Sequence, residues 1–138
     1  MRLVIDTSVV VKAFRSPTGL SAQTLVACRR GAHRMIVSAA LVFEYEAVLS
    51  RPEHLAAAQA DLADAGRFVD AICGFADWIR PSWLWRPQLR DPDDEMVLEA
   101  AVSGGADIVT YNLRNFAPAH RFGVRVLTPK ALWEMDHG

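Results

Sequence analysis

The sequence is poor in several kinds of residue, and each shortage excludes a class of protein. Its only two cysteines, Cys28 and Cys73, lie far apart in helix-like segments, so no disulfide framework is expected. The four histidines show no ligand spacing, which argues against a zinc site. No apolar run approaches the roughly 18 residues that span a bilayer, and the chain does not open on a secretory signal pattern. We therefore expect a cytoplasmic protein that does not contact membranes.

The chain also has little net charge. Its 138 residues include 15 basic and 16 acidic ones, for a net charge of −1 at pH 7. This balance excludes a polycation that holds nucleic acid by bulk charge, so a nucleic-acid substrate would need a local basic patch or metal ions. Thirteen of the 15 cations are arginine, whose planar fork suits phosphate, although genome composition produces the same bias. With 51% apolar residues, we expect residues 1–138 to form one domain.

Short apolar runs alternate with helix-like segments along the chain. Strands are predicted at residues 3–5, 35–37, 78–80, 108–110 and 124–127, and helices at 9–14, 20–30, 39–50, 54–60, 61–77, 91–103 and from 128 onward. The alternation predicts βαβ units and hence an α/β fold, a central parallel sheet between two layers of helices. Between Pro81 and Pro87, Trp83 and Trp85 are either an exposed anchor for a partner or core residues under a loop.

Polar residues follow the predicted strands at the edge where open α/β sheets bind ligands. These residues are Asp6, Ser38, Asn112 and Thr128. Asp6 comes directly after a buried strand. It is either the N-cap of the helix that follows or a functional carboxylate.

Two further acids are predicted on buried helix faces. The neighbours of Glu44 one turn away, Leu41 and Val48, are apolar, and so are the residues three, four and seven positions after Asp94. A carboxylate on a core face costs several kcal/mol unless it is compensated. A partner arginine for Glu44, or a capping-box role for Asp94, would be such a compensation.

The other acids beside Asp94 have simpler interpretations. Asp91 is expected to cap the helix that follows, with Pro92 in its first turn. Asp93 and Glu95 are expected to be solvated acids that favour the positive end of the helix dipole.

Asp6, Glu44 and Asp94 are thus expected to converge at one end of the sheet. Two carboxylates about 4 Å apart repel by about 4 kcal/mol at an effective dielectric of 20. With no lysine or histidine predicted beside them, three such groups require a cation. Oxygen-only ligands favour Mg²⁺ or Mn²⁺ over zinc, and such an ion activates water and holds a phosphate oxygen. The chemistry that follows is hydrolysis of a phosphodiester.

Four segments together resemble the PIN-domain nucleases: residues 5–9, 44–52, 90–101 and 105–110. Among these nucleases, the similarity is to toxins of bacterial toxin–antitoxin systems, related to VapC-type toxins. The resemblance implies a parallel sheet between helices and a Mg²⁺- or Mn²⁺-dependent endoribonuclease that leaves 5′-phosphate and 3′-hydroxyl ends. It also implies an RNA substrate, a cognate antitoxin and a homodimer, with partner contacts expected at the helices of residues 54–77.

By position, Asp6, Glu44 and Asp94 match the family's three acids. The resemblance implies that Asp6 and Asp94 are the main metal ligands and that Glu44 is a ligand or orients the nucleophile. Members of the family often have a fourth acid where this sequence has Asn112. Asn112 would be a weak ligand or would hold a metal-bound water, so the choice between one and two ions stays open.

Other polar residues near these acids have candidate roles in binding the substrate. Thr7 and Ser8 stand where the family has a small polar pair, and either hydroxyl would orient Asp6 or a water. Arg114, Lys12 and Arg15 follow site-bearing turns. Each of these three cations either grips a phosphate or is a solvated surface charge.

Three alternatives compete with a nuclease. An aspartyl-nucleophile phosphatase would need a second acid where Ser8 stands. A phospho-receiver module has a lysine near its last strand, as Lys130 is here, but it would also need a phospho-accepting aspartate at the end of a central strand. The main alternative is a non-catalytic PIN scaffold that binds RNA or a protein. Asn112 favours the scaffold, whereas retention of the three acids argues against it.

Overall fold

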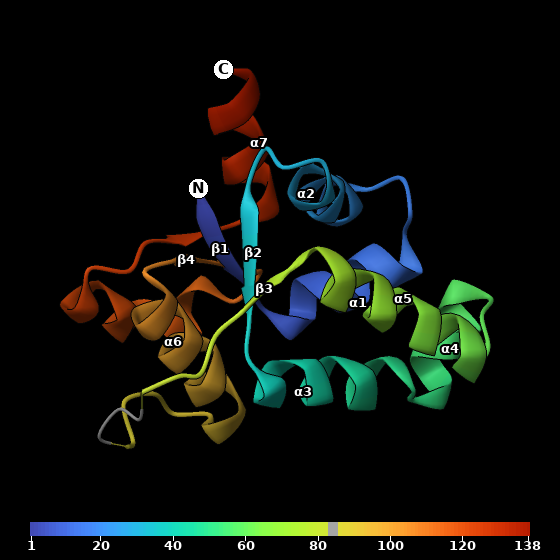
Figure 1. Cartoon of the computed structure of the whole chain (residues 1–138), viewed down its shortest axis with the longest axis horizontal. Coiled ribbons are helices and arrows are strands. Elements are labelled where there is room, and N and C mark those ends of the chain that lie inside the picture. Colours follow the sequence, from blue (N-terminus) through green and yellow to red (C-terminus); the bar gives the residue numbers. More distant parts are fainter. Residues whose placement is uncertain (83–85) are drawn as a thin grey trace.

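The protein is built around a parallel sheet. The structure, a computed structural model, describes residues 1–82 and 86–138, so the interpretation of Trp83 and Trp85 falls outside the described residues. All strand pairs of the five-stranded sheet are parallel, and the strand order is β3-β2-β1-β4-β5 (Figure 1). The strands are β1 (Arg2–Ile5), β2 (Arg34–Val37), β3 (Asp77–Trp78), β4 (Asp107–Val109) and β5 (Val126–Leu127).

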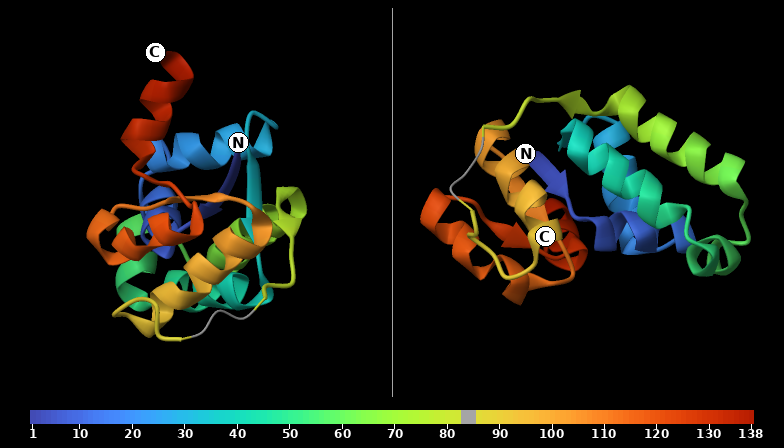
Figure 2. Two further views of the ribbon diagram at one scale, coloured as in Figure 1. Left: turned by 90° about the vertical axis from the view of Figure 1, so that its left-hand side faces the viewer. Right: turned by 90° about the horizontal axis from the view of Figure 1, so that it is seen from below.

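Helices cover both faces of this sheet, which confirms the predicted three-layer α/β fold. Figure 2 shows α6 on one side of β1 and the helices α1, α3 and α5 on the other. No helix within the described residues is long and apolar enough to cross a membrane. The helices are α1 (Thr7–Arg15), α2 (Leu20–Arg29), α3 (Ala39–Leu49), α4 (Pro52–Ala58), α5 (Leu62–Phe75), α6 (Pro92–Gly104), the 3₁₀ helix η1 (Leu113–Phe122) and α7 (Pro129–His137).

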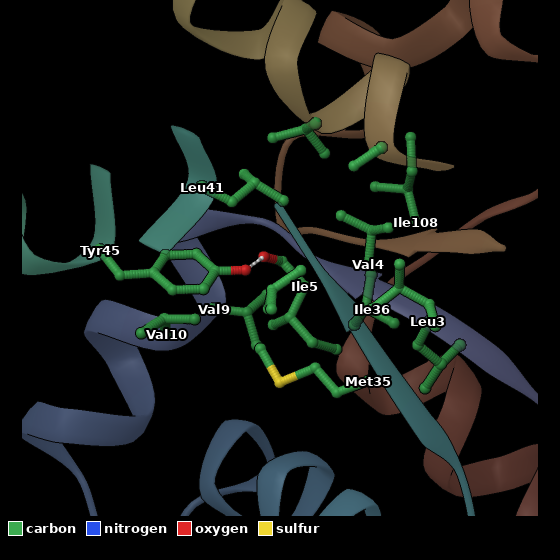
Figure 3. Packing of buried hydrophobic residues seen from close by; sticks show 14 of the residues in the cluster. Leu3, Val4, Ile5, Val9, Val10, Met35, Ile36, Leu41, Tyr45 and Ile108 are labelled. Atoms are coloured by element: carbon green, nitrogen blue, oxygen red, sulfur yellow. Dashed lines mark hydrogen bonds between the residues drawn. The ribbon is translucent and has the colours of Figure 1, made fainter. Parts of the chain in front are cut away.

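The central strands are buried on both faces, as their unbroken apolar runs predict. Leu3, Val4 and Ile5 of β1 are fully inaccessible to solvent. Tyr45 of α3 is equally buried, and its hydroxyl donates a hydrogen bond to the carbonyl of Ile5 (Figure 3). This bond ties α3 to the carboxyl end of β1, so Glu44, the neighbour of Tyr45, is held near that strand end.

Three elements differ from the sequence-based expectation, and one of them is β5, which is shorter than the predicted residues 124–127. The third strand comprises Asp77 and Trp78 rather than residues 78–80, because Asp77 pairs with Ile36 of β2 and forms an ion pair of 2.6 Å with Arg34. Residues 113–122, for which no element was predicted, form η1, two short 3₁₀ helices that meet at a kink at Phe116, and the second contains Pro118. Such a segment could not be predicted, because proline disfavours an α-helix and a short 3₁₀ helix has no repeating pattern of apolar residues in the sequence.

The order of the strands creates a switch point at β1. The chain adds β2 and β3 on one side of β1 and then β4 and β5 on the other. Ligands of open α/β sheets bind beyond the carboxyl ends of the strands at such a point. Asp6 directly follows β1, and Thr110 directly follows β4.

Candidate functional site

A cavity of about 340 Å³ lies at this switch point; we call it the acidic cavity. Six of the residues predicted for the site line it, whereas Arg114 lines an adjoining cavity. The acidic cavity is lined by Asp6, Thr7, Ser8, Val11, Glu44, Val48, Arg51, His54, Asp91, Asp93, Asp94, Asn112 and Asn115.

Asp6 is oriented by two hydroxyl groups and does not act as a helix cap. It occupies the N-cap position of α1, but its side chain makes no capping hydrogen bond. Its Oδ2 accepts hydrogen bonds from Ser8 Oγ at 2.9 Å and from Thr110 Oγ1 at 2.6 Å. Thr110 Oγ1 itself accepts a hydrogen bond of 2.9 Å from the backbone N–H of Asn112. The carboxylate is 5% exposed, and its Oδ1 has no hydrogen-bond partner among the described residues. One oxygen is thus fixed and the other is available to a ligand.

Glu44 is half-buried on the face of α3 that its sequence neighbours predict. Leu41 and Val48, one turn away on either side, are both buried. Burial raises the pKa of the Glu44 carboxyl, Asp93 raises it further, and Arg51 opposes the increase. No ion pair between Glu44 and a cation occurs among the described residues, so a direct arginine partner does not account for this carboxylate.

Asp94 has the least compensated carboxylate of the cavity. It lies in the first turn of α6, and its Oδ2 is buried without a hydrogen-bond partner. Burial, and after it the negative charge of Asp6, raise its pKa to about 6, although a hydrogen bond from Asn115 opposes the change. The predicted cap of α6 is confirmed, because the Asp91 side chain accepts a bond of 2.9 Å from the amide of Asp93. Asp94 takes no part in that cap.

These groups suit a hard cation. Five carboxylates and one guanidinium line the acidic cavity, and Asn112 and Asn115 add amide oxygens. Within the described ranges, no three His, Cys, Asp or Glu side chains are gathered closely enough to enclose an ion as they stand. Mg²⁺ is commonly bound through only one or two carboxylates, with water and substrate phosphate as its other ligands. The donor types and the unpartnered Oδ2 of Asp94 fit an ion of that kind.

Sequence reasoning missed several residues that line the cavity or contact its acids. Arg51 lies seven residues after Glu44, so helical periodicity places both on one side of α3 and its end. Thr110 lies beside Asp6 because Ile5 pairs with Val109, a register that short strands do not reveal in advance. Asn115 lies in η1, an element that was not predicted.

The interpretation of Glu95 as a solvated acid was wrong. Glu95 is 2% exposed, and its Oε1 accepts hydrogen bonds from the amides of Gln88 at 2.6 Å and Leu89 at 2.9 Å. The physical reason is that the segment before α6 folds back over the helix and covers Glu95. Asp94 is therefore not the only one of these acids on a buried face, and Glu95 fastens the loop that leads to Asp91.

Comparisons with known proteins agree with this architecture. A family model described as PIN domain matches residues 2–114. The chain is similar to the structure of VapBC2 from Rickettsia felis bound to a DNA fragment from its promoter, with 13% identity, a TM-score of 0.63 and coverage of 93% of this chain and 98% of that one. It is also similar to VapBC-1 from nontypeable Haemophilus influenzae, with 14% identity, a TM-score of 0.64 and coverage of 94% and 99%.

A third similar structure is a domain of a functionally unknown protein from Methanocaldococcus jannaschii, with 16% identity, a TM-score of 0.53 and coverage of 92% of this chain and 89% of that one. No curated protein matches the sequence. At these identities the structural similarity shows the fold, while the family model assigns most of the chain to a family.

Proposed function

The chain belongs to the PIN domain family, and on that premise we propose that it is a cytoplasmic Mg²⁺- or Mn²⁺-dependent endoribonuclease, the toxin of a bacterial toxin–antitoxin pair. One observation carries the proposal: Asp6, Glu44 and Asp94, from three distant parts of the chain, line one cavity at the switch point of the sheet. The buried, unpartnered Oδ2 of Asp94 leaves this cluster incomplete without a cation.

Each acid has a separate part in the proposed reaction. Asp6 and Asp94 would hold the ion, and Mg²⁺ or Mn²⁺ bound there would lower the pKa of a water and stabilise negative charge on the phosphate. Glu44, with its raised pKa, is suited to accept the proton of the attacking water. The water oxygen would bond to phosphorus as the bond to the 3′ oxygen breaks, and the 3′ oxygen would take up a proton from solvent, which leaves 5′-phosphate and 3′-hydroxyl ends. Asn112 would orient water at the edge of the site.

A protein partner is part of the proposal. Two of the similar structures are of VapB and VapC together, which supports an antitoxin for this chain. An apolar groove of about 520 Å³ lies among α1, α2 and α5, with Phe14, Leu25, Phe68 and Phe75 in its lining. It includes α5, within the segment where the resemblance places partner contacts, and it would accept a helix of the antitoxin or of a second copy of the chain.

Cleavage of a mixed panel of end-labelled RNAs in Mg²⁺ and Mn²⁺ tests the proposed activity. We expect cleavage that EDTA abolishes and that added Mn²⁺ restores. Calorimetric titration with Mn²⁺ should show binding in parallel, because the same ion is required for both results. If the protein binds no Mn²⁺ at about millimolar concentration and leaves every RNA intact, the non-catalytic scaffold replaces the nuclease.

Thr110→Val is expected to weaken Mn²⁺ binding about 10- to 100-fold, the usual effect of removing a hydrogen-bond partner of a metal ligand. Valine has nearly the shape of threonine but lacks the hydroxyl that holds Asp6 at 2.6 Å. Thr110→Ser keeps the hydroxyl and should retain most of the affinity. Calorimetry on both variants separates the two outcomes: equal losses in Val and Ser would mean that packing rather than the hydrogen bond positions Asp6.

A further inference from the structure

Two more cavities adjoin the acidic cavity. One is lined by residues of α1, and the other is lined by residues of the segment that precedes α6. The first, the α1 cavity, has a volume of about 500 Å³ and shares Ser8 and Val11 with the acidic cavity. The second, the loop cavity, has a volume of about 1070 Å³ and shares Asp91 and Asn115 with it. Since α1 and α6 lie on opposite sides of β1 (Figure 2), the three cavities follow one another across the carboxyl edge of the sheet.

Each flanking cavity presents two cations that form no ion pair with a carboxylate of the described residues. Lys12 and Arg15 line the α1 cavity, and Arg90 and Arg114 line the loop cavity. All four are exposed, and in the described part of the chain none of them forms an ion pair. Other cations of the protein are engaged: Arg34 and Arg125, for example, bind Asp77 and Asp107. Unpaired cations on both sides of an acidic cavity are arranged to bind a polyanion that crosses it.

An aromatic ring also faces the α1 cavity. Tyr111 lines that cavity, and its side chain is 45% exposed. Its hydroxyl is hydrogen-bonded to that of Ser21 at 2.5 Å, which holds the ring in place. A fixed, exposed ring is a surface on which an unpaired base stacks, whereas the bases of a duplex are already stacked on one another.

We propose that the protein binds a single RNA strand across these three cavities, with its phosphates on Lys12 and Arg15 on one side of the cleaved bond and on Arg90 and Arg114 on the other. The inference rests on the proposed function and adds the residues of this chain that hold the substrate. Tyr111 stacks on one base of the strand. The four cations offset the repulsion between the acidic cavity and the phosphodiester backbone, which the near-neutral protein as a whole does not do.

The salt dependence of RNA binding tests this path. The probe is a fluorescein-labelled single-stranded RNA of about 12 nucleotides, followed by anisotropy from about 50 to about 250 mM KCl on the Asp94→Asn protein, which should not cleave it. Removal of one phosphate contact lowers the slope of log K against log salt by about 0.7 for a single strand. Each of two double variants should therefore lower the slope by about 1.4. One combines Lys12→Gln with Arg15→Gln, and the other combines Arg90→Gln with Arg114→Gln.

Two control variants separate the proposed contacts from a general charge effect. Arg121 lies in η1 like Arg114, is exposed, has no ion pair among the described residues and lines none of the three cavities, so Arg121→Gln should leave the slope nearly unchanged. Tyr111→Ala should weaken binding about 10-fold without lowering the slope, because stacking releases no counterions. A duplex of the same sequence should bind more weakly than the single strand.

Distinct results would overturn the path and the function. If both pairs of substitutions behave like Arg121→Gln while the wild type still cleaves RNA, the path is wrong and the nuclease stands. If duplex and single strand bind equally well and Tyr111→Ala has no effect, the substrate is not selected as a single strand. If the wild type neither cleaves nor binds RNA in Mn²⁺, the proposed function fails with the path. Circular dichroism on each variant confirms that it is folded.

Discussion

Asp94→Asn is expected to abolish cleavage and, at neutral pH, to make the protein more stable. The substitution removes the negative charge of a proposed metal ligand, and since even the partners of metal ligands account for about 10- to 100-fold in activity, cleavage should fall at least about 100-fold. The stability gain has a different origin. The Asp94 pKa of about 6 in the folded protein lies above the ordinary value of 3.8, so the folded state disfavours the charged carboxylate.

The sign of the stability effect follows from proton linkage. Between about pH 4 and about pH 6 the folded protein binds more protons at Asp94 than the unfolded chain does, so stability falls as pH rises through this window. At pH 7 the full penalty is present. Allowing for solvent around the partly exposed side chain, asparagine should recover about 1–2 kcal/mol, or about 3–6 °C in Tm.

Thermal denaturation at about pH 7.5 and about pH 4.5 measures this effect. The difference in Tm between Asp94→Asn and wild type should be large at the higher pH and only about a third as large at the lower one. Asp70→Asn, at an exposed aspartate of α5, is the matched control and should change Tm little at either pH. An Asp94→Asn protein that is folded but no more stable at neutral pH would show that other groups already compensate this carboxylate.

Cleavage should fall steeply below about pH 6, about tenfold per pH unit when one carboxyl is protonated and more when both are. In the proposed reaction Asp94 must be ionised to hold a cation and Glu44 must be ionised to accept a proton, and burial raises the pKa of both. Because protons and the metal ion compete for the same oxygens, a higher Mn²⁺ concentration should move the midpoint of the profile to lower pH.

The profile of kcat/KM from about pH 5 to about pH 8, at two Mn²⁺ concentrations, checks this expectation. Far-ultraviolet circular dichroism at the lowest pH serves as the control for unfolding. A flat profile would mean that neither carboxyl is needed in its charged form. If the midpoint of the profile does not change with Mn²⁺ concentration, the loss of cleavage at low pH comes from a group other than the proposed metal ligands.

Local sequence patterns were sufficient for the fold class and for the orientation of the acids. The runs at residues 3–5 and 35–37 are apolar throughout, and parallel strands buried on both faces have this pattern. Leu41 and Val48 indicated the helix face of Glu44, and Val97 and Leu98 indicated that of Asp94, because residues three and four apart share a helix face. Asp91 was recognisable as a cap from the proline that follows it.

Helical spacing does not show what covers a face from outside the helix. Glu95 was misread for this reason: it stands in the first turn of α6 like a solvated acid, but the loop amides of Gln88 and Leu89 bind it. The same limit applied to Thr110, which lies 104 residues from Asp6 and meets it only through the pairing of β1 with β4.

The sequence by itself thus determined the parallel α/β architecture, and it predicted that Asp6, Glu44 and Asp94 lie at one end of the sheet, where they line one cavity. Only the tertiary structure decided which hydroxyls orient Asp6, which carboxylates are buried, and that unpaired cations flank the acidic cavity on both sides. These features arise where loops and strand ends from distant parts of the chain meet. Their positions depend on the packing of whole elements, which no local period encodes.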